Sequence, residues 1–430
     1  MNGKQIATQL EETRRDTHRL LTPVDDERLT TQHDPLLSPL VWDYAHIGVF
    51  EELWLLQNLS SGQRVDEDLL HTYNAVENPR HTRRRLELMD RPRTLAYLAD
   101  VRTRALNLME ELDRDDERDP NHGLLRDGFV YDLVNQHERQ HQETICQTLQ
   151  LLPGGYLKEL PPTPPGRRAD HDMVDVPAGR YPIGTDAYEP YDNEKPRHEV
   201  ALEAFRIDRF PVTNGEYLRF MEDGGYTRQE LWSPSGWDWV MTFGIQGPEY
   251  WSNRDGGWTA DRFGVTEPVP QEEPVVHVCY FEADAYARWA GKRLPTEFEW
   301  EVAATWDPAT GSRRRFPWGE GTSNGDRANL GTWRFHPAPA GAYPEGASPL
   351  GCEQMLGDVW EWTSSDFQPY PGFRAFPYEE YSEPFFGTGF KVLRGGSWAT
   401  HPSVARATFR NWDSPIKRPI FAGLRCAADA

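Results

Sequence analysis

Two histidines four residues apart, His137 and His141, are the side chains of this 430-residue sequence best spaced to do chemistry. On a helix, residues at i and i+4 lie one above the other on the same face. Two imidazoles on one core-facing stripe are typical of metal ligands, because both nitrogens can converge on one ion; hydrogen-bonded core histidines are the alternative. The stripe is indicated by apolar residues that recur around the pair at helical spacing, namely Val130, Leu133, Val134, Ile145 and Leu149.

The five residues from His137 to His141 also match the His-Glu-x-x-His pattern of zinc metallopeptidases. That interpretation requires Glu138 beside the metal as general base and a third protein ligand further along the chain. The pattern is short and tolerant, so chance matches are common. A zinc metallopeptidase is therefore kept as an alternative hypothesis.

A third metal ligand is predicted upstream, at His46. A helix is expected over 39–59, capped by Ser38 and opened by Pro39. Three neutral imidazoles from two core-facing helices would form a metal site with open positions, as catalysis requires. A hydrogen-bonded core histidine remains the other interpretation of His46. Its predicted apolar stripe contains Trp42, Ala45, Val49, Leu53 and Leu56.

Composition excludes several classes of function. A net charge of −22 and a pI near 5.0 argue against a nucleic-acid surface, which needs a basic face. No run of 18 apolar residues is present, so no membrane span is expected. The first residues lead into a polar amphipathic segment and not a signal-peptide core. Four scattered cysteines without a Cys-x-x-Cys pair fit a reduced, cytoplasmic protein.

A change in composition divides the sequence into two predicted domains. Residues 1–150 hold only 2 of the 16 tryptophans, and glycine and proline are also sparse there. We expect an α+β protein: a helical bundle over 1–158, a proline-rich linker over 159–172 and a strand-rich domain over 173–430 with two helices, 214–222 and 282–291. The bundle is predicted to contain four helices, near 3–21, 39–59, 92–112 and 123–152.

Five arginines lie between residues 80 and 91, after the second predicted helix. A solvated face is the ordinary interpretation of such a cluster. In so acidic a protein, guanidinium groups can also bind a substrate carboxylate bidentately. His71 and His81 are rival third metal ligands in the same stretch. They stand in loop sequence without an apolar stripe, so His46 is preferred.

The second domain resembles the formylglycine-generating-enzyme fold, a C-type-lectin-like domain. Enzymes of that family carry a reactive cysteine pair shortly after the Gly-Gly-Ser-Trp motif. This sequence has no cysteine between Cys352 and Cys426, so the resemblance does not imply that chemistry. The resemblance rests on five motifs in order: 205–217, 289–301, 357–362, 393–398 and 423–426.

A DinB-like bundle with three histidines ahead of such a domain resembles the ergothioneine-biosynthetic sulfoxide synthases. The resemblance implies an Fe(2+) enzyme that uses O2 to join a thiol to the imidazole ring of N-alpha-trimethylhistidine (hercynine). It also implies that His46, His137 and His141 are the iron ligands. Iron(II) with three neutral ligands keeps its full charge, which favours binding of a thiolate.

The same resemblance places Tyr378 around the substrates, and because a phenol is neutral at pH 7 and can donate along a hydrogen bond, Tyr378 is predicted to be the catalytic donor of a proton or hydrogen atom. The spacing of Arg80 and Arg83 resembles the branch that uses gamma-glutamylcysteine, although Arg84 also fits. The related branch that uses free cysteine remains a rival, as do a thiol transferase using the bundle alone and a sugar-binding lectin using the second domain alone. Other positions that match residues around the substrates are Gln140, Tyr381, Asn411, Trp412 and Asp413.

Overall fold

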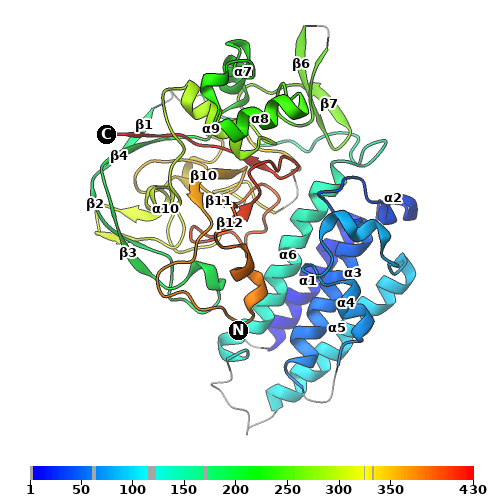
Figure 1. Ribbon diagram of the computed structural model, residues 1–430. Helices are drawn as coiled ribbons and strands as arrows, with labels where there is room; N and C mark the ends of the chain where they lie inside the picture. Colours follow the sequence, from blue (N-terminus) through cyan, green and yellow to red (C-terminus); the bar gives the residue numbers. More distant parts are fainter. Residues whose placement is uncertain are drawn as a thin grey trace. The chain divides into compact units, whose positions relative to one another are not determined.

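The computed structural model describes residues 3–60, 64–114, 123–167, 172–254, 256–323, 325–331 and 334–430. The chain divides into two compact units, Met1–Lys158 and Glu159–Ala430. The first unit is helical and the second combines short strands with helices (Figure 1). Across the described ranges, no helix is both long enough and apolar enough to span a membrane.

Four long helices form the first unit, and α6 packs against both α1 and α3 (Figure 1). They are α1 (Gly3–Leu21), α3 (Leu40–Glu52), α5 (Arg91–Arg114) and α6 (Phe129–Leu149). A π-helical turn, Leu53–Gln57, continues α3. The shorter elements are α2 (Asp26–Thr30), α4 (Glu67–Thr72) and the 3-10 helices Arg80–Arg85 and Arg126–Gly128.

Two details of the helix predictions were wrong. The last helix begins at Phe129 and not near residue 123, because Asp127 and Gly128 adopt left-handed backbone angles with φ of 53° and 79°. Ser38 does not cap α3, since Pro39 occupies the N-cap position without a side-chain cap. The buried Ser38 hydroxyl instead accepts a hydrogen bond from Arg83.

A buried network of charges joins four helices of the first unit. Arg14 on α1 donates to Glu138 on α6, at 2.9 and 3.1 Å, and to Glu51 on α3, at 2.7 Å. Arg102 on α5 donates to the same Glu51, at 2.6 and 3.0 Å. Thr17 donates a further hydrogen bond to Glu138, at 2.7 Å. Two arginines and two glutamates thus balance one another in the interior.

Two main sheets organise the second unit (Figure 1). The first has the order β1-β4-β14 and is antiparallel, with β1 (Met173–Val176), β4 (Phe205–Asp208) and β14 (Ala427–Asp429). The second has the order β12-β11-β10-β13, and its β10–β13 pair is parallel. Its strands are β10 (Trp360–Asp366), β11 (Lys391–Arg394), β12 (Asn411–Asp413) and β13 (Ala422–Gly423).

Smaller antiparallel pairings complete the strand content. The pairings are β2 (Gly179–Ile183) with β3 (His198–Leu202), β5 (Trp251–Arg254) with β6 (Gly257–Arg262) and β7 (Val265–Pro268), and β8 (Trp306–Asp307) with β9 (Ser312–Arg313). The 3-10 helices are Asp192–Glu194, Gln229–Leu231, Pro344–Gly346, Glu379–Tyr381 and Glu383–Phe385.

Four α-helices lie in the described part of the second unit, where the sequence predicted two. The predicted pair corresponds to α7 (Asn214–Glu222) and α9 (Tyr280–Trp289). The others are α8 (Pro234–Phe243) and α10 (Glu297–Thr305). Helix α10 starts with a capping box in which Thr296 and Glu299 satisfy each other's backbone N–H groups.

Buried arginine–carboxylate pairs fix the core of the second unit. Glu297 at the start of α10 accepts from Arg410 at 2.8 and 2.9 Å and from Arg394 on β11 at 3.3 Å. Arg410 also donates to the backbone carbonyls of Asn193 and Gln368, at 2.8 and 2.9 Å. These contacts hold the chain immediately before β12 against two distant segments.

Residues 159–167, predicted as part of a linker, are held on the second unit. Arg167 pairs with Glu353 at 2.9 Å, and its backbone N–H donates to the Ala340 carbonyl at 3.0 Å. The Pro161 carbonyl lies 2.9 Å from Nε2 of His336. The proline-rich stretch therefore packs as part of that unit.

Candidate metal centre

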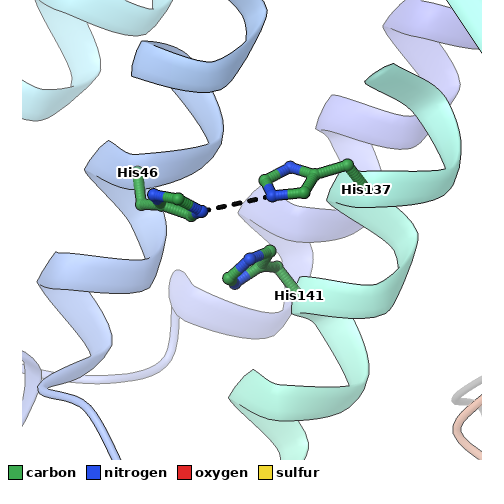
Figure 2. Close-up of side chains that lie close together, drawn as sticks. All are labelled: His46, His137 and His141. Carbon is green, nitrogen blue, oxygen red and sulfur yellow. Dashed lines mark hydrogen bonds between the residues drawn. The ribbon is translucent and has the colours of Figure 1, made fainter. Parts of the chain in front are cut away.

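Three imidazoles converge inside the helical unit, His46 from α3 with His137 and His141 from α6 (Figure 2). One ligand atom from each ring lies within 4.8 Å of the others. The Nε2 atoms of His46 and His137 are 3.2 Å apart. A triangle of nitrogens on this scale can surround one ion with only small side-chain adjustments.

Two of the rings are oriented by hydrogen bonds on the side away from the triangle. His46 Nδ1 lies 2.7 Å from the Tyr73 carbonyl, and His141 Nδ1 lies 3.0 Å from Oδ1 of Asp43. Both partners accept, so each ring donates from Nδ1 and turns Nε2 toward the triangle. This is the support that metal-binding histidines usually have.

Asp43 and Tyr73 were not predicted from the sequence as supports of the histidines. A signal for Asp43 exists, since an acidic residue stands three positions before His46 on a helix that is otherwise apolar there. No local signal points to Tyr73, because a backbone carbonyl contributes through chain geometry alone.

Burial among aromatic rings keeps His46 and His137 neutral. His137 stacks on Phe50, with ring centroids 3.6 Å apart, and His46 stacks on Trp42 at 4.7 Å. Burial, with lesser repulsion from His141, holds the pKa of His46 and of His137 well below the ordinary histidine value. Both rings are therefore neutral at pH 7, the form that binds metals.

The donor set fits a divalent first-row transition metal. Three neutral imidazole nitrogens suit iron or zinc, whereas magnesium and calcium prefer oxygen ligands. Nδ1 of His137 is buried without a hydrogen-bond partner, which is an unusual state for a polar atom in a core. His46, His137 and His141 are thus the residues that would hold the metal.

Glu138 points away from this triangle although it lies inside the His-Glu-x-x-His pattern. Its carboxylate binds Arg14 and Thr17 on α1. Burial alone would raise the pKa of Glu138, but the Arg14 charge and the hydrogen bonds from Arg14 and Thr17 outweigh it and lower the pKa. A carboxylate held in this way is not available as a general base beside a metal.

The 3-10 helix Arg80–Arg85, called the arginine segment below, is connected to the three histidines through Trp42. Arg83 is buried, with its guanidinium carbon 3.4 Å from the ring centre of Trp42, and it donates to the Asn78 carbonyl at 2.9 Å. Within the described residues Arg83 forms no ion pair, and burial, opposed in part by attraction to Asp43, lowers its pKa to about 9. Arg80 is half-buried.

The rival ligands His71 and His81 are both exposed and stand outside the three-histidine group. His71 lies in α4, not in a loop as predicted, and pairs with Glu77. Arg84 is exposed as well, and Gln140 is half-buried on α6.

Several predicted residues of the second unit form one aromatic group. Tyr381 stacks on Tyr191 with centroids 4.4 Å apart, and its ring meets that of Trp412 edge-on at 5.5 Å. Tyr378 lies edge-on to Tyr381 at 6.2 Å. Trp412 stacks on Phe367 at 4.2 Å. Of these, Tyr191 and Phe367 were missed from the sequence, where nothing distinguishes them from other aromatic residues.

Asn411 and Asp413 flank Trp412 on β12. Asp413 forms an ion pair with Lys417 at 2.9 Å and caps the backbone N–H of Ser414. The Asn411 side-chain oxygen accepts from the Trp412 backbone N–H at 3.0 Å. The three predicted residues therefore share one short strand.

Comparison with known proteins matches both units. Residues 9–145 match the DinB superfamily, and residues 159–430 match the Sulfatase-modifying factor enzyme 1-like domain. A hercynine oxygenase of Mycobacterium tuberculosis is 49% identical over 99% of both chains. One of Mycolicibacterium smegmatis is 48% identical over 99% of this chain and 98% of its own. A formylglycine-generating enzyme of Streptomyces coelicolor is 34% identical over 63% of this chain and 93% of its own.

Replacing His46, His137 or His141 by Ala should remove most of the bound metal, because two imidazoles hold a divalent ion far more weakly than three. The measurement is metal content per chain by mass spectrometry after metal loading and desalting. His71→Ala is the matched control and should retain the metal. Full metal content in His46→Ala would show that the site lies elsewhere.

Glu138→Gln should retain the metal but lower the free energy of unfolding by about 3–5 kcal/mol, because it removes one of the two carboxylates that balance the buried Arg14 and Arg102. Chemical denaturation followed by helical circular dichroism measures this change. Glu12→Gln on the exposed face of α1 should change stability by less than about 0.5 kcal/mol. Loss of all catalysis in a stably folded Glu138→Gln protein that keeps its full metal content would restore the metallopeptidase interpretation.

Proposed function

Because this chain belongs to the hercynine oxygenase family, we propose that it is an iron(II) enzyme that uses O2 to join gamma-glutamylcysteine to hercynine. The thiol S–H and one imidazole C–H are lost, a carbon–sulfur bond forms, one oxygen atom becomes the sulfoxide oxygen and the other leaves as water. The observation that supports this most directly is the three-histidine triangle in a chain alignable over its whole length with hercynine oxygenases. The proposed product is the sulfoxide used in ergothioneine biosynthesis.

Iron is proposed because the family is one of oxygenases and the donor set suits it. Bound at His46, His137 and His141, iron(II) would supply a redox-active centre with open coordination positions. The protein side chains contribute neutral ligands whose orientation is fixed by Asp43 and the Tyr73 carbonyl. Zinc would satisfy the same nitrogens but could not supply electrons to O2.

Gamma-glutamylcysteine is proposed as the thiol because of the arginine segment. This thiol carries two carboxylates, whereas free cysteine carries one. Arg83 is a buried cation that forms no ion pair with any described residue and is only partly compensated by Asp43, so a substrate carboxylate would relieve its desolvation. Arg80, less buried on the same 3-10 helix, is proposed to bind the carboxylate alongside it. The rival hypothesis is the related reaction with free cysteine.

Residues of the second unit are proposed to bind hercynine. Its quaternary ammonium suits an aromatic face such as that of Trp412, and Asp413 carries a complementary charge. Asn411 can donate hydrogen bonds to the carboxylate or the imidazole, and Gln140 of the first unit is a further proposed substrate-binding residue. Tyr381 contacts Trp412 directly and would shape the same surface.

Tyr378 is proposed as the catalytic donor of a proton or hydrogen atom. Burial, together with nearby Tyr191 and Asp192, raises the pKa of Tyr378 well above its ordinary value. The phenol is therefore protonated at neutral pH and can donate along a hydrogen bond.

Iron-loaded protein should consume O2 with hercynine and gamma-glutamylcysteine together and form a product of the mass of the coupled sulfoxide. Arg80→Ala should raise the KM for gamma-glutamylcysteine about ten- to hundredfold and that for hercynine much less, since one charge-assisted contact is lost. Kinetics with each thiol, followed by mass spectrometry, test both statements.

The exposed Arg84→Ala variant is the control and should leave both KM values nearly unchanged. A wild-type preference for free cysteine would reject the thiol assignment. Absence of any coupled product with either thiol at full iron content would reject the proposed reaction.

Tyr378→Phe should keep iron and both substrates but divert the reaction toward oxidation of the thiol to a sulfinate, because the bound thiolate is then the nearest group to react. The ratio of sulfoxide to sulfinate, measured by mass spectrometry at matched iron content, is the readout. A normal ratio at a normal rate would place the donor elsewhere, and Tyr381 would be tested next.

A further inference from the structure

Three consecutive residues of the second unit, Tyr191 to Asn193, hold the segment that carries Tyr378 and Tyr381. Oδ1 of Asp192 accepts a hydrogen bond from the Ser382 hydroxyl at 2.7 Å, and Oδ2 accepts from the Phe376 backbone N–H at 3.4 Å. The Asn193 side-chain amide donates to the same Ser382 hydroxyl at 2.9 Å. The Tyr191 ring stacks on that of Tyr381.

The two residues that Asp192 contacts lie on either side of Tyr378 and Tyr381 in the sequence. Phe376 lies two residues before Tyr378, and Ser382 lies one residue after Tyr381. One carboxylate therefore ties together both ends of a seven-residue segment, 376–382, that contains both tyrosines. The intervening 3-10 helix, Glu379–Tyr381, has no side-chain cap of its own, so its ends depend on contacts from outside.

The environment of Asp192 is unusual for a carboxylate. Asp192 is 2% exposed and Ser382 is fully buried, yet in the described part of the chain Asp192 forms no ion pair. The nearby Arg406 is engaged by Glu194, and Lys195 donates to a backbone carbonyl. Burial raises the pKa of Asp192 to about 6, although hydrogen bonds from Ser382 and Phe376 oppose the shift. Attraction to Lys195 also opposes the shift, but a buried acidic group without an ion pair is more typical of functional sites than of cores.

We propose that Asp192 is a positioning residue for Tyr378: by holding both ends of segment 376–382, its carboxylate keeps the phenol where it can donate. The inference rests on the proposed function, which gives Tyr378 its role as donor. Asp192 does not touch the reacting atoms in this scheme. Its negative charge also disfavours ionisation of the nearby phenol, which keeps the proton on Tyr378.

The first test measures whether Asp192 holds the segment. In the full-length, iron-loaded protein, Asp192→Ala and Ser382→Ala should both increase hydrogen–deuterium exchange over residues 374–385, with Phe376 losing the acceptor of its N–H in the first variant. Loss of one charge-assisted contact corresponds to about tenfold in the population of the held conformation. Glu199→Gln, which changes an exposed carboxylate on β3, is the control. Unchanged exchange in both folded variants would overturn the proposal.

The second test asks whether the effect acts through Tyr378. Asp192→Ala should lower the sulfoxide-to-sulfinate ratio at matched iron content, and it should cause no further change in a Tyr378→Phe background. A merely structural role would lower the amount of active protein without changing the ratio. A ratio that is unchanged in Asp192→Ala, or that falls equally in both backgrounds, would overturn the positioning role.

These measurements separate the inference from the function on which it rests. Absence of coupled product in the wild-type protein would reject the proposed function, while the exchange measurement would still decide whether Asp192 holds the segment. A Tyr378→Phe effect without an Asp192→Ala effect would reject the inference and leave the function standing. Ser382→Ala, a smaller change, supplies both readouts if Asp192→Ala does not fold.

Discussion

The rotation of α6 about its own axis is the constraint on which the metal centre depends. His137 and Glu138 are neighbours in sequence and so project about 100° apart around the helix. Glu138 is bound by Arg14 and Thr17 on α1, in a buried network that would be strongly destabilised by losing one partner. With that face committed to α1, His137 and its neighbour one turn later, His141, are directed to α3. The contacts of Glu138 with α1 therefore fix the direction of His137 and His141 without contacting either ring.

Trp42 and Asp43 connect the three histidines to Arg83. Trp42 contacts both the His46 ring and the Arg83 guanidinium, so one side chain bridges a histidine of the triangle and the arginine segment. Asp43, adjacent in sequence, orients His141 and attracts Arg83. The charge on Arg83 and the three histidines are thus coupled by short-range packing and Coulomb attraction.

Buried ion pairs also hold in place the segments of the second unit that carry the aromatic group of Tyr381 and Trp412. Glu297 binds Arg394 and Arg410, and Arg410 reaches the Asn193 carbonyl. The turn that holds segment 376–382 and the strand that carries Trp412 are therefore anchored to one carboxylate. Although the unit belongs to the fold of formylglycine-generating enzymes, no cysteine stands between Cys352 and Cys426. The unit therefore shares the fold of those enzymes but lacks the cysteine pair that they carry after the Gly-Gly-Ser-Trp motif.

The sequence by itself determined the two-part organisation, the long helices and the metal-binding candidates, because periodicity and i, i+4 spacing are local properties. His46 was identified by its apolar stripe, and the structure brings it to His137 and His141. Only the tertiary structure decided that Glu138 faces α1, that Arg83 is buried against Trp42 and that Asp192 reaches Ser382, 190 residues away. Each of these depends on which residues distant in sequence become neighbours, and no local pattern contains that information. The predicted Ser38 cap was wrong because Pro39 occupies the N-cap position, and the Ser38 hydroxyl accepts from the distant Arg83 instead.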